Sequence, residues 1–378
     1  ALRQLRSPLF DVTGQTLLCN KARPSMTQDL RRMLTVRTDE VRNILHRHAL
    51  LGILVVAYGL LAFSVTTYFE FKISGGMIGA LVWHFVNKVP QMVILVLFGR
   101  LVYLTYVAKV PNRMEVLRAE ILAVLTRPER LFSGFLAFAL MGSVLMSFAQ
   151  LKMSIPLFHP FSWDVAMMKL DQLLHFGRHP YALAHAIFGG HYSLTTFSLT
   201  YNYWLFVTYF VLFGACFVNP DSPQRMQYMI AFLFTWGVGG NLMAILFSSA
   251  GPPYYALLGL GDAYEPLLAM LRDHANAGGM SETGIQDRLW QTYTRPNGIN
   301  SISAFPSMHV ASSVLMAIYG FAITRWLGYL LSAFAATIMV GSVLLGWHYA
   351  VDGYAGALIA VASWKLSGWL IRSRIGPF

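Results

Sequence analysis

Long apolar runs, separated by short polar segments, dominate the chain. Eight of them are long enough to cross the roughly 30 Å hydrocarbon core of a bilayer as helices, and Asp, Pro, Arg or Trp-Gly segments that end helices lie between them. We therefore predict an all-α polytopic membrane protein with about eight transmembrane helices. The expected spans are Leu50–Tyr68, Ile78–Val107, Leu131–Leu151, Tyr203–Val218, Met229–Phe247, Met308–Ile323, Leu327–Leu345 and Tyr354–Ile371.

The composition narrows the class further. Hydrophobic residues make up 56% of the chain and charged residues only 12%, and the mean hydropathy is +0.52. These values disfavour a disordered chain and a nucleic-acid-binding protein, because the net charge of +11 sits on a chain too apolar to fold in water. Cys19 and Cys216 are the two cysteines, so neither a disulfide framework nor a thiolate metal cluster is expected.

The positive charge instead indicates how the spans are oriented. With eight spans both termini lie on one side, and nineteen of the 28 Lys and Arg residues fall on that side. Since basic residues accumulate in short cytoplasmic segments, we expect both termini in the cytoplasm. The long segments 154–199 and 248–307 then face the other side. A periplasmic face of a bacterial inner membrane is expected, and a lumenal face of a Golgi-like membrane is topologically equivalent.

Two segments outside the spans have the character of interfacial helices. Residues 1–48 form a basic N-terminal segment, expected to lie along anionic lipid on the cytoplasmic side, and residues 49–378 form the transmembrane domain. Between 160 and 190, apolar residues recur at helical spacing, which predicts an interfacial helix on the outer face. His175 and His179 there are four residues apart, as metal ligands often are, but no third ligand is implied and no metal is expected.

Candidate chemistry lies at the outer ends of the last three spans. The segment 295–309 leads into the sixth span, and the segment 346–353 joins the seventh to the eighth. The sixth span leaves the outer face at His309 and the seventh returns to that face at His348. Both imidazoles and Asp352 are therefore expected at a similar membrane depth, where ionisable residues indicate function.

These groups suit covalent phosphoryl transfer. An imidazole attacks phosphorus when a carboxylate orients its other nitrogen, and Asp352 lies four residues after His348. His309 is then the general acid for the departing oxygen. Ser307 is expected to cap the sixth span, where free backbone N–H groups favour a phosphate. Arg295 and Arg288 are the expected clamp for the phosphate oxygens.

The motifs resemble a known family. Pro306-Ser307-Met308-His309 resembles the Pro-Ser-x-His signature of the type 2 phosphatidic acid phosphatase superfamily, and the segment 348–352, His-Tyr-Ala-Val-Asp, resembles its later His-x-x-x-Asp signature. The resemblance implies a six-helix lipid phosphatase-like catalytic core. It also implies a phospho-histidine intermediate on His348, oriented by Asp352, with His309 as acid and then base, and neither a metal nor an organic cofactor.

Departures from the phosphatase motifs favour one branch. The position six residues before His348 holds Ser342, where the phosphatases carry an arginine for the extra charge of a monoester. This difference favours a phosphodiester substrate and resembles the inositol phosphorylceramide synthase-like branch. The segment Pro252-Pro253-Tyr254-Tyr255 resembles the Pro-Pro-aromatic stretch of that branch, and Pro253, Tyr254 and Tyr255 are expected to bind substrate. Arg288 and Arg295 match the spacing of the phosphatases' first motif, Lys-x6-Arg-Pro, with Arg in place of Lys.

Three functions follow from these features. The preferred one is a lipid phosphotransferase that moves a phospho-headgroup from a phospholipid donor to a lipid alcohol, with no nucleic-acid partner. If water reaches the same intermediate, the enzyme is a lipid or polyprenyl phosphate phosphatase. A transporter is the third possibility, and it would use Arg100 and the glycine-rich segment 237–241 inside spans, but it leaves the His309, His348 and Asp352 set unexplained.

Overall fold

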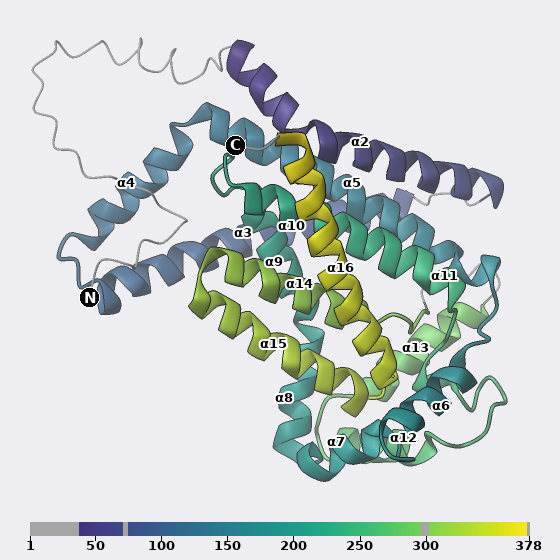
Figure 1. Cartoon of the computed structure of the whole chain (residues 1–378). Helices are drawn as coiled ribbons and strands as arrows, with labels where there is room; N and C mark the ends of the chain where they lie inside the picture. The colour runs from purple at the N-terminus through teal and green to yellow at the C-terminus, as the bar shows by residue number, and fades with distance from the viewer. Residues whose placement is uncertain (1–37, 71–74, 296–301, 376–378) are drawn as a thin grey trace, which may run out of the picture.

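The computed structural model describes residues 38–70, 75–295 and 302–375 (Figure 1). The structure is 81% helical, and the described residues contain no strand. The predicted all-α fold is therefore confirmed.

Seven helical segments of the described chain are long and apolar enough to cross a membrane. An eighth helix, α14 (Met308–Ile323), is apolar but shorter. Together they correspond to the eight predicted spans. The seven are α2 (Thr38–Tyr68), the end of α3 (Gly75–Val102) with its π-helical turn η1 (Tyr103–Val107), α5 (Pro128–Phe158), α8 (His191–Asn202) with α9 (Trp204–Cys216), α10 (Pro223–Phe234) with η2 (Thr235–Met243) and α11 (Ala244–Leu246), α15 (Arg325–Leu344) and α16 (Ala350–Ile375).

Two helices begin twelve residues before the predicted spans. The helix expected from Tyr203 starts at His191. Its polar hydroxyls on Thr195, Thr196 and Thr200 each donate to the carbonyl four residues earlier, so they have partners within the helix. α2 starts at Thr38, so residues 38–48 of the basic segment continue directly into the first span. The rest of that segment, residues 1–37, lies outside the described residues.

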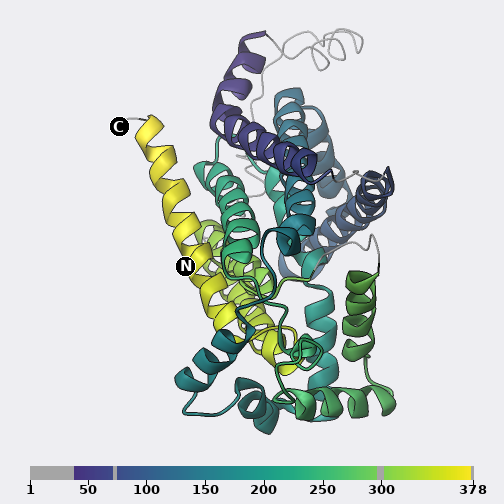
Figure 2. The same ribbon diagram turned by 90° about the vertical axis from the view of Figure 1, so that its right-hand side faces the viewer.

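The segment 160–190 forms two short helices, α6 (Asp164–Leu174) and α7 (Pro180–Phe188). Together with α12 (Glu265–Asn276) and α13 (Glu282–Thr294) they gather at one end of the bundle, which we call the loop-rich end (Figures 1 and 2). α6 exposes Leu173 and is followed by Phe176, which is 97% exposed. Such apolar exposure suits the predicted interfacial position.

α14 is the central helix of the bundle and packs against α10, α15 and α16. Its buried residues Val310, Ala311 and Leu315 face those neighbours. A Cβ at Gly356 of α16 would lie 2.6 Å from the Ser307 carbonyl oxygen, so only glycine permits this approach of the two helices. This packing brings the start of α14 next to the start of α16.

The opposite end of the bundle, where α2 begins and α16 ends, is the terminal end. Buried Arg225 of α10 closes it, because its guanidinium donates to the carbonyls of Ala215 (3.1 Å), Cys216 (2.8 Å) and Ser133 (3.2 Å). Its remaining nitrogen lies 3.4 Å from His48 of α2. Arg225 therefore satisfies the last carbonyls of α9, which have no partner within their own helix.

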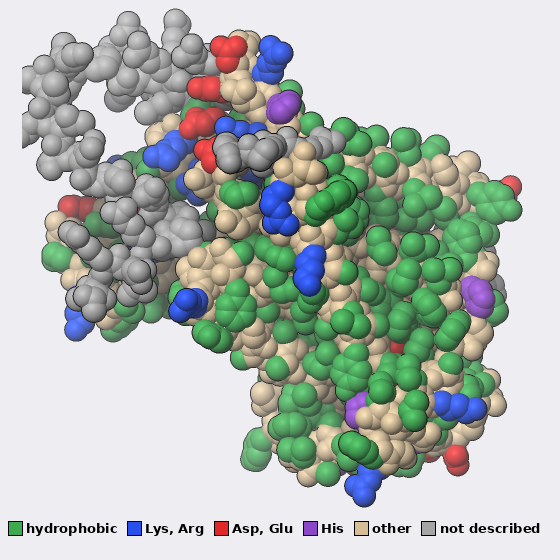
Figure 3. All heavy atoms as spheres, in the orientation of Figure 1, with side chains coloured by type: hydrophobic (Ala, Val, Ile, Leu, Met, Phe, Trp, Pro, Cys, Tyr) green, Lys and Arg blue, Asp and Glu red, His purple; other side chains and the backbone are tan. Residues whose placement is uncertain are grey.

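The surface of the bundle is suited to lipid. In Figure 3 hydrophobic side chains cover the right half of the face, over α2 and α11, whereas charged side chains gather at the upper left and the bottom edge. Ile53, Val56 and Leu60 of α2 are each more than half exposed. An apolar face of this extent would aggregate in water and is stable against lipid chains.

Candidate active site

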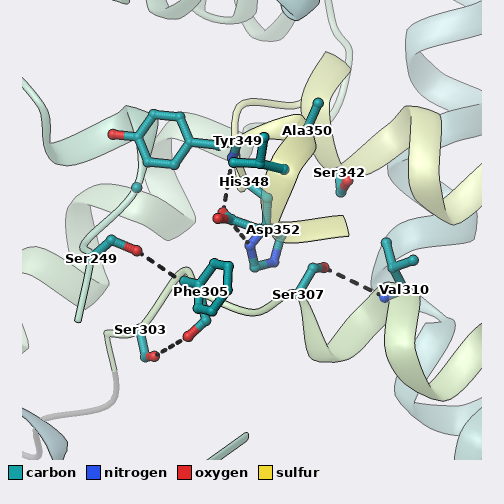
Figure 4. Close-up of polar contacts among 12 residues, drawn as sticks. Ser249, Ser303, Phe305, Ser307, Val310, Ser342, His348, Tyr349, Ala350 and Asp352 are labelled. Carbon is teal, nitrogen blue, oxygen red and sulfur yellow. Dashed lines mark hydrogen bonds and ion pairs between the residues drawn. The ribbon is translucent and has the colours of Figure 1, made fainter. Parts of the chain in front are cut away.

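Three loops meet at the loop-rich end of the bundle (Figure 4). They follow α11, precede α14 and join α15 to α16. The Ser249 carbonyl accepts from the Ala304 N–H at 2.9 Å, and the Ser249 hydroxyl accepts from the Phe305 N–H at 3.1 Å. The Ser307 N–H donates to the Asp352 carbonyl at 3.0 Å. These backbone bonds hold the loops that carry both sequence motifs in one place.

His348 and Asp352 form the predicted pair. The His348 Nδ1 lies 3.4 Å from the Asp352 Oδ2, and the two side chains are buried (Figure 4). The same Oδ2 accepts from the Tyr349 N–H at 3.0 Å, which holds the carboxylate in position. With Nδ1 turned to Asp352, Nε2 is the ring nitrogen left for another partner.

His309 faces this pair from the first turn of α14. Its ring centroid lies 5.8 Å from that of His348. Tyr201 stacks on one side of the ring at 4.3 Å, and Trp204 packs against it at 4.0 Å. Ser307 caps α14 as predicted, since its hydroxyl accepts from the Val310 N–H. Helix start, cap and stacking together fix where the His309 imidazole points.

A cavity of about 410 Å³ opens onto both imidazoles. Its wall is mainly apolar and aromatic, and Lys152 of α5 also lines it. An apolar wall with a few polar groups is typical of a small-molecule site. The aromatic residues of the wall are Phe148, Trp204, Tyr209, Trp236, Tyr254, Phe305 and Trp347.

The two predicted arginines lie apart from this cavity. Arg288 is exposed on α13, and its Nε donates to the Gly284 carbonyl in its own helix. Arg295 is exposed directly after α13 and borders residues 296–301, which the structure does not describe. Neither arginine lines the cavity. Their contact with phosphate stays a prediction.

Ser342 occupies the position of the missing arginine. Its hydroxyl donates to the Met339 carbonyl at 2.8 Å, and its own carbonyl accepts from the His348 N–H at 3.0 Å. The side chain is buried and carries no charge toward the cavity. Ser342 therefore supports the backbone of His348 but adds nothing to bind a second phosphate charge.

The aromatic stretch after α11 is divided between cavity and core. Tyr254 lines the cavity, stacks on Trp290 at 5.1 Å and donates to the Gln286 carbonyl at 3.1 Å. Pro253 and Tyr255 are buried but do not line the cavity. Of the three predicted substrate contacts, Tyr254 is the one that the structure brings to the site.

Sequence reasoning missed two carboxylates on α6. Asp164 accepts from the N–H groups of Ala250 (3.0 Å) and Gly251 (2.8 Å) and from the Tyr349 hydroxyl (2.9 Å). Asp164 thereby ties the loop after α11 to the loop of His348. Burial raises the pKa of Asp164.

Asp171 lies on α6, two helical turns after Asp164, and binds the first turn of α16. Its carboxylate accepts from the Ala350 and Val351 N–H groups, each at 2.9 Å, and so caps the helix that carries Asp352. Burial raises the pKa of Asp171 to about 6. The seven-residue spacing of Asp164 and Asp171 on a predicted amphipathic helix was the available signal, because it places both on one face.

Glu282, at the start of α13, is a further buried carboxylate that the sequence did not indicate. It accepts from the Trp347 Nε1–H at 2.8 Å and from the Asn202 amide at 3.0 Å. Burial raises the pKa of Glu282. Since Trp347 lines the cavity, Glu282 fixes part of its wall from behind.

His175 and His179 lie in the loop between α6 and α7 and bind different partners. The His175 ring meets the Tyr354 hydroxyl at 2.9 Å, whereas His179 meets the Gln172 amide at 3.1 Å and stacks on Tyr181. Within the described ranges no three His, Cys, Asp or Glu side chains come together as metal ligands would.

The features that suggested a transporter have partners inside the bundle. Arg100 pairs with Glu120 through two nitrogen–oxygen contacts. Asn241 accepts from the Tyr58 hydroxyl and donates to the Phe148 carbonyl. A Cβ at Gly240 would lie 2.6 Å from the Phe148 ring. The glycine-rich turn therefore serves close helix packing.

Fold and site together define an integral multi-pass membrane protein of the lipid phosphatase and phosphotransferase type, which acts on membrane lipids. Residues 165–366, more than half of the chain, match the family model of the PAP2 superfamily, and the chain belongs to that superfamily. This confirms the resemblance to the type 2 phosphatidic acid phosphatases. No curated protein and no solved structure matches the chain. The matched range includes His309, His348, Asp352 and Asp171, whereas Lys152 and Asp164 precede it.

Proposed function

We propose that the protein is a lipid phosphotransferase that moves a phospho-headgroup from a phospholipid donor to a lipid alcohol, as in the inositol phosphorylceramide synthase-like branch. One observation carries the proposal. His309 and His348 face the same cavity with ring centroids 5.8 Å apart, and Asp352 lies on the far nitrogen of His348. A phosphate between the two rings is within reach of a nucleophile and of an acid at once.

The reaction has two steps. The His348 Nε2 forms a bond to phosphorus while the bond from phosphorus to the donor's glycerol oxygen breaks, and His309 gives that oxygen a proton. Diacylglycerol leaves, and the headgroup phosphate stays on His348. His309 then takes the proton from the acceptor hydroxyl, whose oxygen attacks phosphorus and releases the His348 nitrogen. Asp352 holds the His348 ring and stabilises its positive charge.

Two features of the region around His348 support the transfer of a phosphodiester group. Ser342 brings no charge where the phosphatases carry an arginine. The wall is largely apolar and aromatic, which favours a lipid alcohol over water as the acceptor. A lipid phosphatase is the second candidate. Lys152 favours it, because a monoester dianion needs more positive charge than a diester.

We place this site on the non-cytoplasmic face of the membrane. The site occupies the loop-rich end, whereas Arg47, Arg130 and Arg225 lie toward the terminal end. Basic residues favour the cytoplasmic side. A bacterial inner membrane with a periplasmic site fits this orientation.

A lipid-product assay tests the proposal. Purified protein is mixed with phospholipids labelled in the headgroup phosphate and with ceramide or diacylglycerol as acceptor. We expect label on the acceptor lipid, and a loss of about 10⁴-fold or more in His348→Ala. His46→Ala serves as the control, since His46 is exposed on α2. Free inorganic phosphate from monoester lipids would make the protein a phosphatase, and full turnover by His348→Ala would refute the phospho-histidine reaction.

A further inference from the structure

Lys152 is a cation placed where a bilayer makes charge costly. It lies six residues before α5 ends at Phe158, within a helix apolar enough to span a membrane. Ionisable side chains in such helices are expensive and mark functional sites. Lys152 is half-buried and lines the same cavity as His309 and His348.

Two other cations of the bundle have compensating partners, whereas Lys152 has no carboxylate partner in the described chain. Arg100 pairs with Glu120, and Arg225 donates to three carbonyls. Across the part of the chain that the structure describes, no carboxylate lies within ion-pair distance of Lys152. The cost of holding this ammonium in the bundle is therefore not offset by the protein itself.

The rest of the cavity wall adds no negative charge. No Asp or Glu is among the described residues that line it. Asp352 is turned to His348, and Glu282 is bonded behind Trp347. Lys152 and His309 line the same cavity, so the ammonium and the proposed acid face a common ligand space.

We propose that Lys152 binds a non-bridging oxygen of the substrate phosphate and makes the cavity select donors whose headgroup carries no positive charge. This inference rests on the proposed function. As the bond from His348 to phosphorus forms, charge gathers on the phosphoryl oxygens, and the ammonium neutralises it without giving up its proton. In a donor with a hydroxylated, uncharged headgroup such as inositol or glycerol, Lys152 attracts the phosphate and repels nothing.

A choline headgroup meets a different balance. Its quaternary ammonium would gain from the faces of Trp204, Trp236 and Trp347. Lys152 repels the same group inside a cavity of only about 410 Å³. A cavity built for choline combines aromatic faces with negative charge, and the described wall here has the aromatic faces and a positive charge instead.

The test compares two donors that differ only in the headgroup, phosphatidylinositol and phosphatidylcholine with identical acyl chains. For the unsubstituted protein we expect kcat/KM at least tenfold higher for phosphatidylinositol. In Lys152→Met, kcat/KM for phosphatidylinositol should fall by about 100-fold, and the values for the two donors should differ by less than threefold. Lys152→Arg should keep the preference. Lys169→Met is the matched control, because Lys169 is exposed on α6.

A binding measurement separates this inference from the reaction. His348→Ala protein, which should not turn over, is titrated with each lipid in detergent micelles, with and without Lys152→Met. We expect phosphatidylinositol to bind at least tenfold more weakly when Lys152 is replaced. If Lys152→Met fails to fold, as judged by thermal unfolding, Lys152→Gln takes its place.

The outcomes are distinct. Equal use and binding of both lipids by protein that carries Lys152, or unchanged preference in Lys152→Met, would overturn the inference and leave the transferase intact. Full turnover by His348→Ala would overturn the proposed function, whatever the lysine variants do.

Discussion

Two cations inside the bundle show how its ends differ. At the terminal end, Arg225 is 1% exposed and donates to three backbone carbonyls. At the loop-rich end, Lys152 faces a cavity and meets no carboxylate in the described chain. The Trp204 Nε1–H, in a residue that lines the same cavity, also has no hydrogen-bond partner among the described residues. Arg225 therefore stabilises the fold, whereas polar groups without a partner that line the cavity are available to a ligand.

The largest expected effect concerns the acid at the loop-rich end. His309→Gln should lower the transfer rate by about 10²- to 10⁴-fold, because glutamine cannot give or take the proton. Thermal unfolding should shift little, since the ring lies at the cavity. His175→Gln, at the same end but outside the cavity, is the control. If the amount of folded protein fell by as much as the transfer rate, the loss of activity would be explained by unfolding, and His309 would be a structural residue.

Replacement of Arg225 should have the opposite effect, a loss of stability with little change in activity. Arg225→Met should lower the free energy of unfolding by about 2–4 kcal/mol, because three buried carbonyls lose their donor. The activity per folded molecule should stay within about twofold. Thermal unfolding in detergent, together with the rate corrected for folded protein, measures both. A large fall in that corrected rate would show that the two ends are not independent.

The smallest effect is expected from the Asp171 cap and depends on pH. Its pKa of about 6 lies above the usual 3.8, so the carboxylate is ionised at pH 7 and takes up a proton near pH 6. One acceptor of the Ala350 and Val351 N–H groups is then lost, and kcat/KM should fall about tenfold by pH 5. Stability has the opposite sign, because a raised folded-state pKa means that protonation favours the folded state between about pH 6 and 4.

Asp171→Asn isolates this effect from the histidines. The amide does not titrate. The ratio of kcat/KM of the unsubstituted protein to kcat/KM of the variant should therefore decrease as the pH is lowered from 6 to 5. Effects of pH on the rest of the site are common to both proteins and cancel in this ratio. The variant itself should be about tenfold less active at pH 7, because its NH₂ group faces a backbone N–H. A ratio that stays constant from pH 7 to 5 would show that protonation of Asp171 does not affect kcat/KM.

Much of the fold was predictable because lipid imposes a simple rule. A span must be long and apolar, and that rule located all eight helices. It missed the helix at residues 191–202, a polar sequence whose threonine hydroxyls find hydrogen-bond partners within the helix. It also treated residues 160–190 as one helix, whereas Pro180 begins a second one.

The site was predictable as far as local sequence reaches. His309, His348 and Asp352 stand at span ends, and topology alone brings them together. The spacing of Asp164 and Asp171 places both on one helix face, but local sequence does not reveal that Asp171 bonds to groups 179 and 180 residues away. Nor does it reveal that Lys152 lines the same cavity as the two imidazoles. The arginines were chosen by spacing, and the spacing did not reveal that α13 carries Arg288 on its exposed side.

The hydrogen bonds between α6 and the start of the last helix have a consequence for the biosynthesis of the protein. Asp171 and its partners on α16 are 179 and 180 positions apart, and Asp164 and Tyr349 are 185 apart. At the usual pace of synthesis the ribosome needs roughly ten to forty seconds to cover that distance. During this time both carboxylates wait at the membrane surface in water. His348 and Asp352 are synthesised together with the final span, so the proposed site is incomplete until that span has been made.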